Sequence, residues 1–160
     1  MENSFNDVKK KREAAEALQK KIEEDNRLSK EKKELEDKRL FMYYSNQYSE
    51  FVLRVLNDLK EAIYPAENYS VSGPMNYRDR DRSWVNESDW RPCWEIGSQY
   101  EETSDISSHT YIVGTTLLQI IFEFDSKKNP VFLCQIDKSH KLYCPATEAD
   151  LIRTLHKLYQ

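Results

Sequence analysis

Glycine and proline are scarce in this chain, with three and five among 160 residues, and neither occurs before Pro65. Because both residues interrupt helices, their absence leaves the first sixty-four residues free to form one. The three glycines, Gly73, Gly97 and Gly114, form no phosphate-binding loop. ATP, GTP and dinucleotide chemistry by the usual routes is therefore disfavoured.

Cysteine pairs and long apolar segments are also lacking. The chain has three cysteines, an odd number, and they include no CxxC pair: Cys93, Cys134 and Cys144. This pattern is typical of a protein in a reducing compartment. Residues 1–16 are polar, and no segment approaches the ~18 apolar residues of a membrane span. We therefore expect an intracellular chain, cytoplasmic by default, with no membrane partner.

The charge is mixed rather than of one sign. The formal net charge is -4, and residues 7–39 hold 12 basic and 10 acidic residues while the remainder is acidic. Neither part is a polycation, so a broad surface for nucleic acid or anionic membranes is not favoured. Aromatic residues make up 12% of the chain, which indicates a real hydrophobic core.

Residues 1–40 are predicted to form a projecting charged helix with few apolar positions. Leu18 and Ile22 belong to one ladder of heptad spacing, and Leu28 and Leu35 belong to a second ladder that is out of phase with the first. Residues 25–29 are the one plausible interruption. We expect a possible coiled coil in which Leu18, Ile22, Leu28 and Leu35 pair with a partner helix or with a second copy.

Residues 41–160 are predicted to form a single α+β domain. Its first helix presents a dense apolar stripe: Phe41, Tyr44, Tyr48, Phe51, Val52, Val55, Leu59 and Ile63. An antiparallel meander of four to six strands follows, with candidates at 69–72, 93–100, 109–125, 130–137 and 141–144. The first candidate should end at Gly73–Pro74, and Gly114 should mark a bend, bulge or tight turn. The apolar run 118–124 belongs in the centre of the sheet.

A short C-terminal helix is predicted to pack on this sheet. Thr147 and Asp150 have the spacing of a capping box at its start. Its apolar face comprises Leu151, Ile152, Leu155, Leu158 and Tyr159.

The stretch 77–94 alternates Arg with Asp and holds three Trp residues. If it is extended, Arg78, Arg80, Arg82 and Trp84 point to one side and could bind phosphate, carboxylate or an aromatic partner. The intervening aspartates cancel much of the attraction for phosphate, so a solvated loop with internally packed rings is the preferred interpretation. If an interface exists here, its residues are Arg78, Arg80, Arg82, Trp84 and Trp90.

Two candidate chemical sites are weaker still. Cys134, His140 and Cys144 could bind zinc together with Cys93, but closely spaced ligand pairs are missing. Asp105, Asp125 and Lys127 have the spacing of a metal-dependent nuclease core, although 125–130 also has the composition of a hairpin turn. We therefore predict no metal and no cofactor.

The leading hypothesis is a non-enzymatic interaction or assembly module that oligomerises through its helix and presents an Arg/Trp loop. One alternative is a small nucleic-acid-associated protein that uses Arg78, Arg80 and Arg82 with the basic cluster at residues 9–12. Another is a nuclease-like enzyme that uses Asp105, Asp125 and Lys127.

Overall fold

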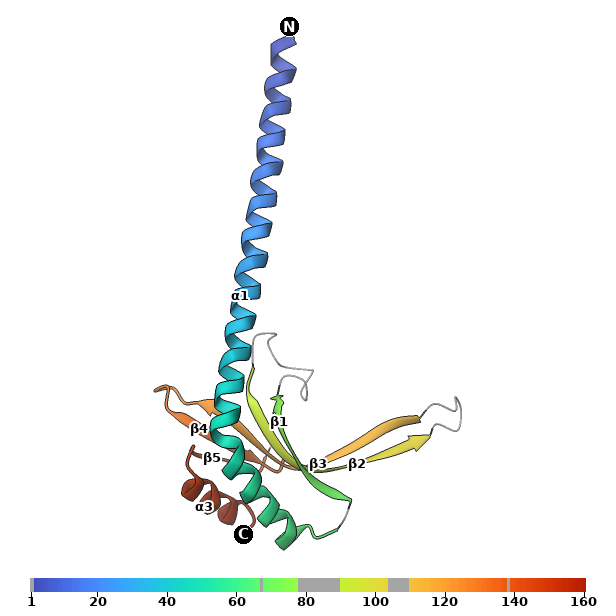
Figure 1. Cartoon of the computed structure of the whole chain (residues 1–160), viewed down its shortest axis with the longest axis vertical. Coiled ribbons are helices and arrows are strands. Elements are labelled where there is room, and N and C mark those ends of the chain that lie inside the picture. The colour runs from blue at the N-terminus through green and yellow to red at the C-terminus, as the bar shows by residue number, and fades with distance from the viewer. Residues whose placement is uncertain (1, 67, 78–89, 104–109, 138) are drawn as a thin grey trace. The chain divides into compact units, whose positions relative to one another are not determined.

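The computed structural model describes residues 2–66, 68–77, 90–103, 110–137 and 139–160, with the backbone only at 2–4, 99–103 and 110–113. The elements follow the order α1 (Glu2–Ile63), β1 (Tyr69–Asn76), β2 (Pro92–Thr103), β3 (Thr110–Phe124), β4 (Pro130–Gln135), β5 (Lys141–Pro145) and α3 (Glu148–Leu158) (Figure 1). The predicted α+β class, with a long first helix, a meander sheet and a short last helix, is confirmed.

Helix α1 passes through residues 25–29 without a break. Arg27 lies in this segment and links neighbouring turns, since its Nε is 3.1 Å from Glu24 and its Nη1 is 2.7 Å from Glu31. The helix ends at Ile63, two residues before Pro65, as the proline predicted. Two compact units divide the chain, residues 1–39 and residues 40–160. None of the described helices is both long and apolar enough to span a membrane.

The sheet is an antiparallel meander with the order β1-β2-β3-β4-β5, so the apolar run 118–124 lies in its central strand, as predicted. Gly114 of β3 pairs with Gln99 of β2 in continuous register, so the prediction of a tight turn or a bulge at Gly114 is wrong. The irregularity instead falls between Ile96 and Gly97 of β2. A Cβ atom on Gly97 would lie 2.7 Å from the Thr115 carbonyl oxygen, so close approach of the two backbones requires glycine there.

Strand β1 continues beyond its predicted end, through Gly73–Pro74 to Asn76. The pairing with β2 shifts between Ser72 and Met75, which accommodates the two residues between them. Because β1 is an edge strand, the missing N–H of Pro74 removes no bond from the centre of the sheet. Gly73 has φ +125°, a conformation that residues with a side chain rarely adopt.

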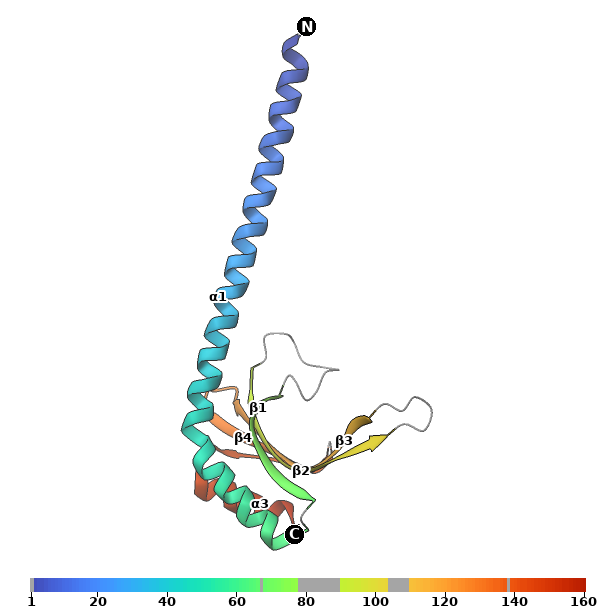
Figure 2. The same cartoon turned by 45° about the vertical axis from the view of Figure 1, so that its right-hand side comes forward.

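Residues 40–63 of α1 and the whole of α3 cover the same face of the sheet (Figures 1 and 2). The residues buried between the helices and the sheet form one core: Tyr48, Val52, Val55, Leu56, Trp94, Ile96, Leu118, Ile120, Phe122, Phe132, Cys134, Cys144, Leu151 and Leu155. Most of the predicted helical stripe is buried or half-buried in this way. Ile63 and Ile152 were predicted to face the core, but they are exposed.

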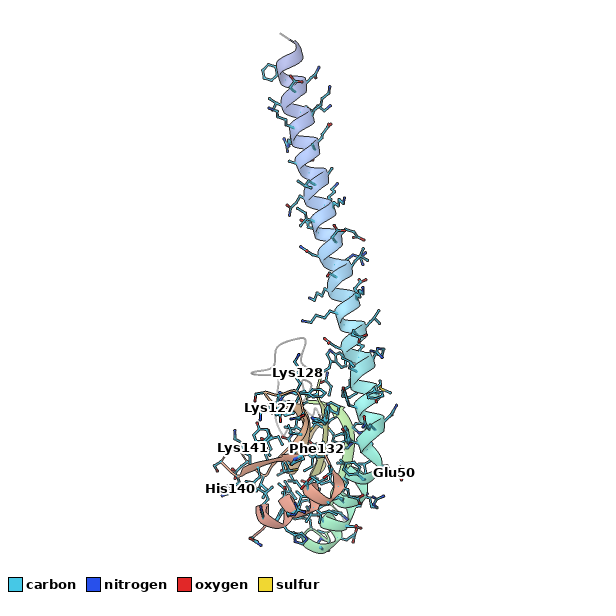
Figure 3. The ribbon with its side chains drawn as sticks, turned by 90° about the vertical axis from the view of Figure 1, so that its left-hand side faces the viewer. Glu50, Lys127, Lys128, Phe132, His140 and Lys141 are labelled. Atoms are coloured by element: carbon cyan, nitrogen blue, oxygen red, sulfur yellow. The ribbon has the colours of Figure 1, made fainter. Side chains whose placement is uncertain are left out.

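Phe132 of β4 lies at the centre of the aromatic part of this core (Figure 3). Its ring centroid is 5.5 Å from Tyr48, 6.0 Å from Phe51, 6.2 Å from Phe122 and 6.3 Å from Trp94, each with the planes steeply inclined. Trp94 joins the sheet to α1 because its Nε1 donates to the Ser49 hydroxyl at 3.2 Å. These edge-to-face contacts connect the helix and the sheet directly.

The capping box predicted at the start of α3 is present. Thr147 has extended backbone angles, and its side chain accepts a hydrogen bond from the Asp150 N–H at 3.2 Å. The Thr147 hydroxyl in turn donates to the Asp150 carboxylate at 2.7 Å. The cap satisfies a backbone donor that the helix itself cannot pair.

Candidate interaction surfaces

The four residues predicted to pair α1 with a partner are exposed within the single chain. The side chains of Leu18, Ile22, Leu28 and Leu35 retain 60%, 45%, 50% and 69% of their accessible surface. Phe5 and Val8 are exposed as well. Residues 5–39 bury no side chain of their own, so this part of the helix has no internal hydrophobic support.

Ion pairs between successive turns support this part of the helix instead. Lys9 is 3.9 Å from Glu13, and Arg12 is 3.0 Å from Glu16. Further pairs join Arg27 to Glu31, Lys38 to Glu34, and Arg39 to Glu36. Because these pairs are exposed to solvent and screened by it, each contributes little to stability. Two members of the basic cluster at residues 9–12 thus lie beside carboxylates, which weakens the cluster as a phosphate-binding site.

The Arg/Trp loop lies largely outside the described residues, and this includes Arg78, Arg80, Arg82 and Trp84. Trp90 is described, and its ring packs edge-to-face on Phe41 with the centroids 5.9 Å apart. The base of the loop is closed by a hydrogen bond from the Tyr77 N–H to the Arg91 carbonyl at 2.9 Å.

Arg91 is a residue of this region that the sequence reasoning missed. Its Nη1 is 2.5 Å from the Glu123 carboxylate, and its guanidinium lies 4.8 Å from the centre of the Tyr77 ring. Arg91 falls just outside the alternating Arg/Asp run, and its partner Glu123 comes from β3, so no local pattern indicated the pair.

The sheet face opposite the helices carries a row of polar side chains across three strands. Gln135 donates from Nε2 to Gln119 Oε1 at 2.8 Å, and Gln119 donates from Nε2 to the Glu95 carboxylate at 3.4 Å. The next row holds a small cluster of buried apolar residues, Cys93, Ile121 and Leu133. The polar side chains lie side by side because Glu95 pairs with Gln119 and Gln119 pairs with Gln135 in the strand register.

A groove of about 510 Å³ lies between the last three turns of α1 and α3. Ile63 and Ile152, the two isoleucines that were predicted to face the core, are among its lining residues. At one end the Tyr64 hydroxyl donates to the Tyr159 hydroxyl at 3.4 Å. Sequence periodicity could not indicate this groove, since it depends on how far apart the two helices lie.

The nuclease-like set does not form a site among the described residues. Asp105 lies outside them. The Asp125 carboxylate accepts hydrogen bonds from the backbone N–H groups of Lys127 at 2.9 Å and Asn129 at 2.8 Å, which is the geometry of an Asx turn. Lys127 and Lys128 of this β3–β4 turn are exposed (Figure 3).

The zinc candidates are likewise dispersed. Cys134 and Cys144 belong to the core under the helices, Cys93 lies on the opposite face of the sheet, and His140 lies in the β4–β5 turn. Among the residues that the structure describes, no group of three or more His, Cys, Asp or Glu side chains could hold a metal ion.

Cys134 and Cys144 both lie in this core, and each thiol perturbs the pKa of the other. The interaction with Cys134 lowers the pKa of Cys144, whereas the same interaction and burial raise the pKa of Cys134. Both side chains are enclosed between the sheet and the helices. Buried cysteines of an apolar core are ordinarily unreactive, so this pair is not a candidate nucleophilic site.

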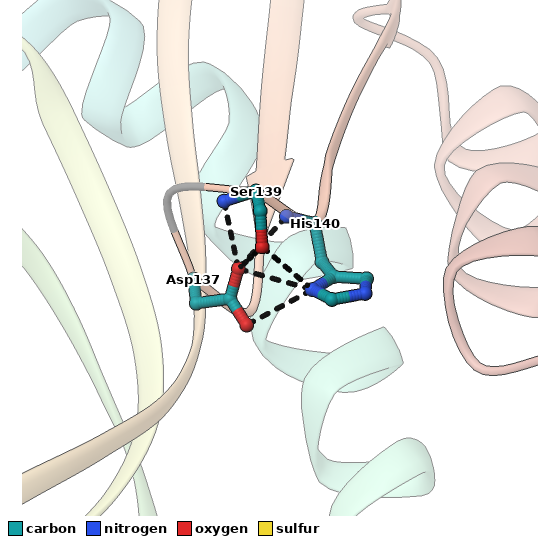
Figure 4. Close-up of polar contacts among 3 residues, drawn as sticks. All are labelled: Asp137, Ser139 and His140. Carbon is teal, nitrogen blue, oxygen red and sulfur yellow. Dashed lines mark hydrogen bonds and ion pairs between the residues drawn. The ribbon is translucent and has the colours of Figure 1, made fainter.

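Asp137, Ser139 and His140 form a tight cluster in the β4–β5 turn (Figure 4). Asp137 Oδ1 accepts from the Ser139 hydroxyl at 2.7 Å and from the backbone N–H groups of Ser139 and His140, each at 2.8 Å. Those bonds to Ser139, followed by the bonds to His140, lower the pKa of Asp137 well below its usual range.

This cluster lacks the geometry of a catalytic Ser-His-Asp set. The hydroxyl of Ser139 and the carboxylate of Asp137 both contact the same ring nitrogen of His140, Nδ1, at 3.1 Å and 3.0 Å. In a catalytic set the base uses one nitrogen for each partner. The arrangement therefore stabilises the turn.

Comparison with protein-family profiles, curated proteins and solved structures found no match to this chain.

Proposed function

We propose that this protein is a non-enzymatic interaction or assembly module in which the helix of residues 1–39 pairs with a partner helix or with a second copy. The single observation that carries the proposal is the exposure of Leu18, Ile22, Leu28 and Leu35 on a helical segment, residues 5–39, in which the structure shows no buried side chain. Pairing would remove these side chains from water, and the hydrophobic effect would drive it.

The expected affinity is modest. Complete burial of a leucine or isoleucine side chain contributes about 1.5–3 kcal/mol, so completing the burial of these half-exposed residues contributes on the order of 1 kcal/mol each. Two helices with four such residues would gain roughly 8 kcal/mol, and association costs about 4–15 kcal/mol. The net gain is therefore at most about 4 kcal/mol, so self-pairing through these residues alone should have a dissociation constant of about a millimolar.

Sedimentation equilibrium of the full chain from about 10 micromolar to about 1 millimolar tests this proposal. We expect reversible self-association that the pair of changes Leu18→Ala and Ile22→Ala abolishes. A matched control is Gln19→Ala with Glu23→Ala, which has the same spacing on the same helix and removes only an exposed hydrogen bond of 3.1 Å. A monomer at every concentration would rule out self-pairing.

The partner-helix form of the proposal has a separate test. The tagged full chain and its Leu18→Ala, Ile22→Ala variant are used side by side to capture proteins from a native extract. A partner that the unchanged chain and the Gln19→Ala, Glu23→Ala control retain, and that the apolar variant loses, supports pairing through the helix. Equal capture by all three chains counts against it.

The rival functions receive less support. A nucleic-acid role would use the cluster at residues 9–12, where Lys9 and Arg12 already lie beside Glu13 and Glu16. It predicts binding to nucleic-acid probes that weakens steeply with salt. A nuclease-like role would use Asp125, whose carboxylate is engaged in a turn. We also propose an intracellular location, which the buried free thiols of Cys134 and Cys144 support.

A further inference from the structure

The groove between residues 55–63 of α1 and α3 has an apolar floor and an accessible edge. Its apolar lining residues are Val55, Leu59, Ala62, Ile63, Ile152 and Leu155. Ile63 and Ile152 keep 41% and 39% of their accessible surface, although their neighbours Val55 and Leu155 are buried. Large apolar side chains left accessible in a depression between two helices are typical of a groove that receives another helix.

The charge around the groove is acidic. Its lining residues include Asp58, Glu148 and His156 but no lysine or arginine. Arg54 lies at its rim, and its Nη2 is 2.6 Å from Glu148. The pKa of Arg54 is raised by the hydrogen bond and charge of Glu148, and then by the charges of Glu50 and Asp58. Two of these carboxylates, Asp58 and Glu148, line the groove.

One segment of the same chain is complementary to the groove. Val8, Ala15, Leu18 and Ile22 follow one another at helical spacing, and Leu18 and Ile22 are exposed. Residues 8–22 contain six basic and two acidic residues, so the segment is a basic amphipathic helix. Residues 24–39, which carry Leu28 and Leu35, hold six residues of each sign and lack this complementarity.

We infer that the groove binds residues 8–22 of a second copy of the chain. The apolar residues of the segment would pack against Ile63 and Ile152, and its lysines would lie near Asp58 and Glu148. The spacing of Ala15, Leu18 and Ile22 matches the i, i+3, i+7 anchors by which a helix occupies a groove. This inference rests on the proposed function and names the surface that the exposed helix occupies.

Chemical cross-linking of the full chain tests the inference directly. Two differently tagged variants, Ile152→Cys and Leu18→Cys, are mixed at about 100 µM and treated with a short bismaleimide. The three native cysteines are buried, so the unchanged chain provides the background. We expect a product between the two tags that is at least tenfold more abundant than with Glu16→Cys, which lies on the opposite side of the helix from Leu18.

Charge reversal provides the second measurement. Asp58→Lys should raise the dissociation constant of the self-associated chain about fivefold, and Lys20→Glu with Lys21→Glu should do the same. Because opposite charges meet again when all three changes are combined, the combined chain should recover affinity to within about twofold of the unchanged chain. Circular dichroism of each variant shows whether the fold is kept. If Asp58→Lys disturbs it, Asp58→Asn with a smaller expected effect replaces it.

The possible outcomes separate this inference from the proposed function. In one outcome, self-association needs Leu18 and Ile22, but Leu18→Cys chains cross-link to one another and not to Ile152→Cys chains. This result would overturn the groove inference, while the proposed helix pairing would stand. A chain that remains monomeric at every concentration would overturn both the groove inference and self-pairing. The proposed partner of residues 1–39 would then be a helix of another protein. A mixed-tag product together with charge recovery supports the groove.

Discussion

Phe132 offers a stringent test of how residues 40–160 are held together. Its side chain is completely buried, and its ring meets four other aromatic rings from α1, β2 and β3. Truncation of a buried phenylalanine to alanine costs about 3–5 kcal/mol, a large share of the roughly 5–15 kcal/mol that stabilises an ordinary domain. Phe132→Leu keeps most of the apolar volume but loses the edge-to-face contacts, so we expect a loss of about 1–2 kcal/mol.

Urea unfolding followed by tryptophan fluorescence measures this loss, because Trp94 is a buried neighbour of Phe132. With a slope of about 1–3 kcal/mol per molar urea, Phe132→Leu should lower the midpoint by roughly 0.5–1 M. The control is Phe124→Leu on β3, whose side chain is 47% exposed and should shift the midpoint far less. Equal shifts for the two variants would show that the helices do not pack on the sheet through Phe132.

Three further predictions concern the backbone and the turns. Gly73→Ala should cost roughly 2–3 kcal/mol and lower the melting temperature, because φ +125° is strained for alanine and the new Cβ would lie 2.7 Å from the Cys93 carbonyl oxygen. Thr147→Ala should cost about 1 kcal/mol by removing the cap of α3, whereas Thr147→Ser should restore most of it in the same urea assay. Asp137→Asn should destabilise the chain at neutral pH, and the difference from the unchanged chain should vanish on acidification. The pKa of Asp137 is lowered by folding, so its contribution is present above about pH 4 and is lost as the folded carboxylate is protonated. A difference that does not shrink between about pH 4 and pH 2 would contradict the assigned hydrogen bonds.

Patterns that local physics determines were predicted well. The absence of glycine and proline before Pro65, the dense stripe that includes Tyr48 and Val52, and the capping residues Thr147 and Asp150 each describe a single element and its immediate neighbours. The central position of residues 118–124 followed from their continuous apolar character, since only a strand with neighbours on both sides can bury such a run.

The errors arose where a local signal was overridden by its surroundings. A Gly-Pro pair such as Gly73–Pro74 normally ends a strand. Here it lies in an edge strand, where the missing N–H of Pro74 matters little, and the shift in the pairing of β1 with β2 accommodates the change in backbone direction. Gly114 was expected to bend β3, yet the close approach of two backbones occurs at Gly97 of β2. Which glycine is needed depends on the neighbouring strand, and a sequence read along one strand does not contain that information.

The amino-acid sequence by itself determined that this chain has a charged, sparsely apolar helix, a meander of strands and a capped final helix. Hydrophobic periodicity and the residues that begin or end an element act over only a few positions, so both can be recognised in the sequence. Tertiary structure decided which apolar residues are actually covered. Ile63 and Ile152 follow the same periodicity as their buried neighbours, but both line the groove and stay exposed. Burial depends on whether a second surface reaches a side chain, and that is a property of how far apart packed elements lie rather than of the order of residues.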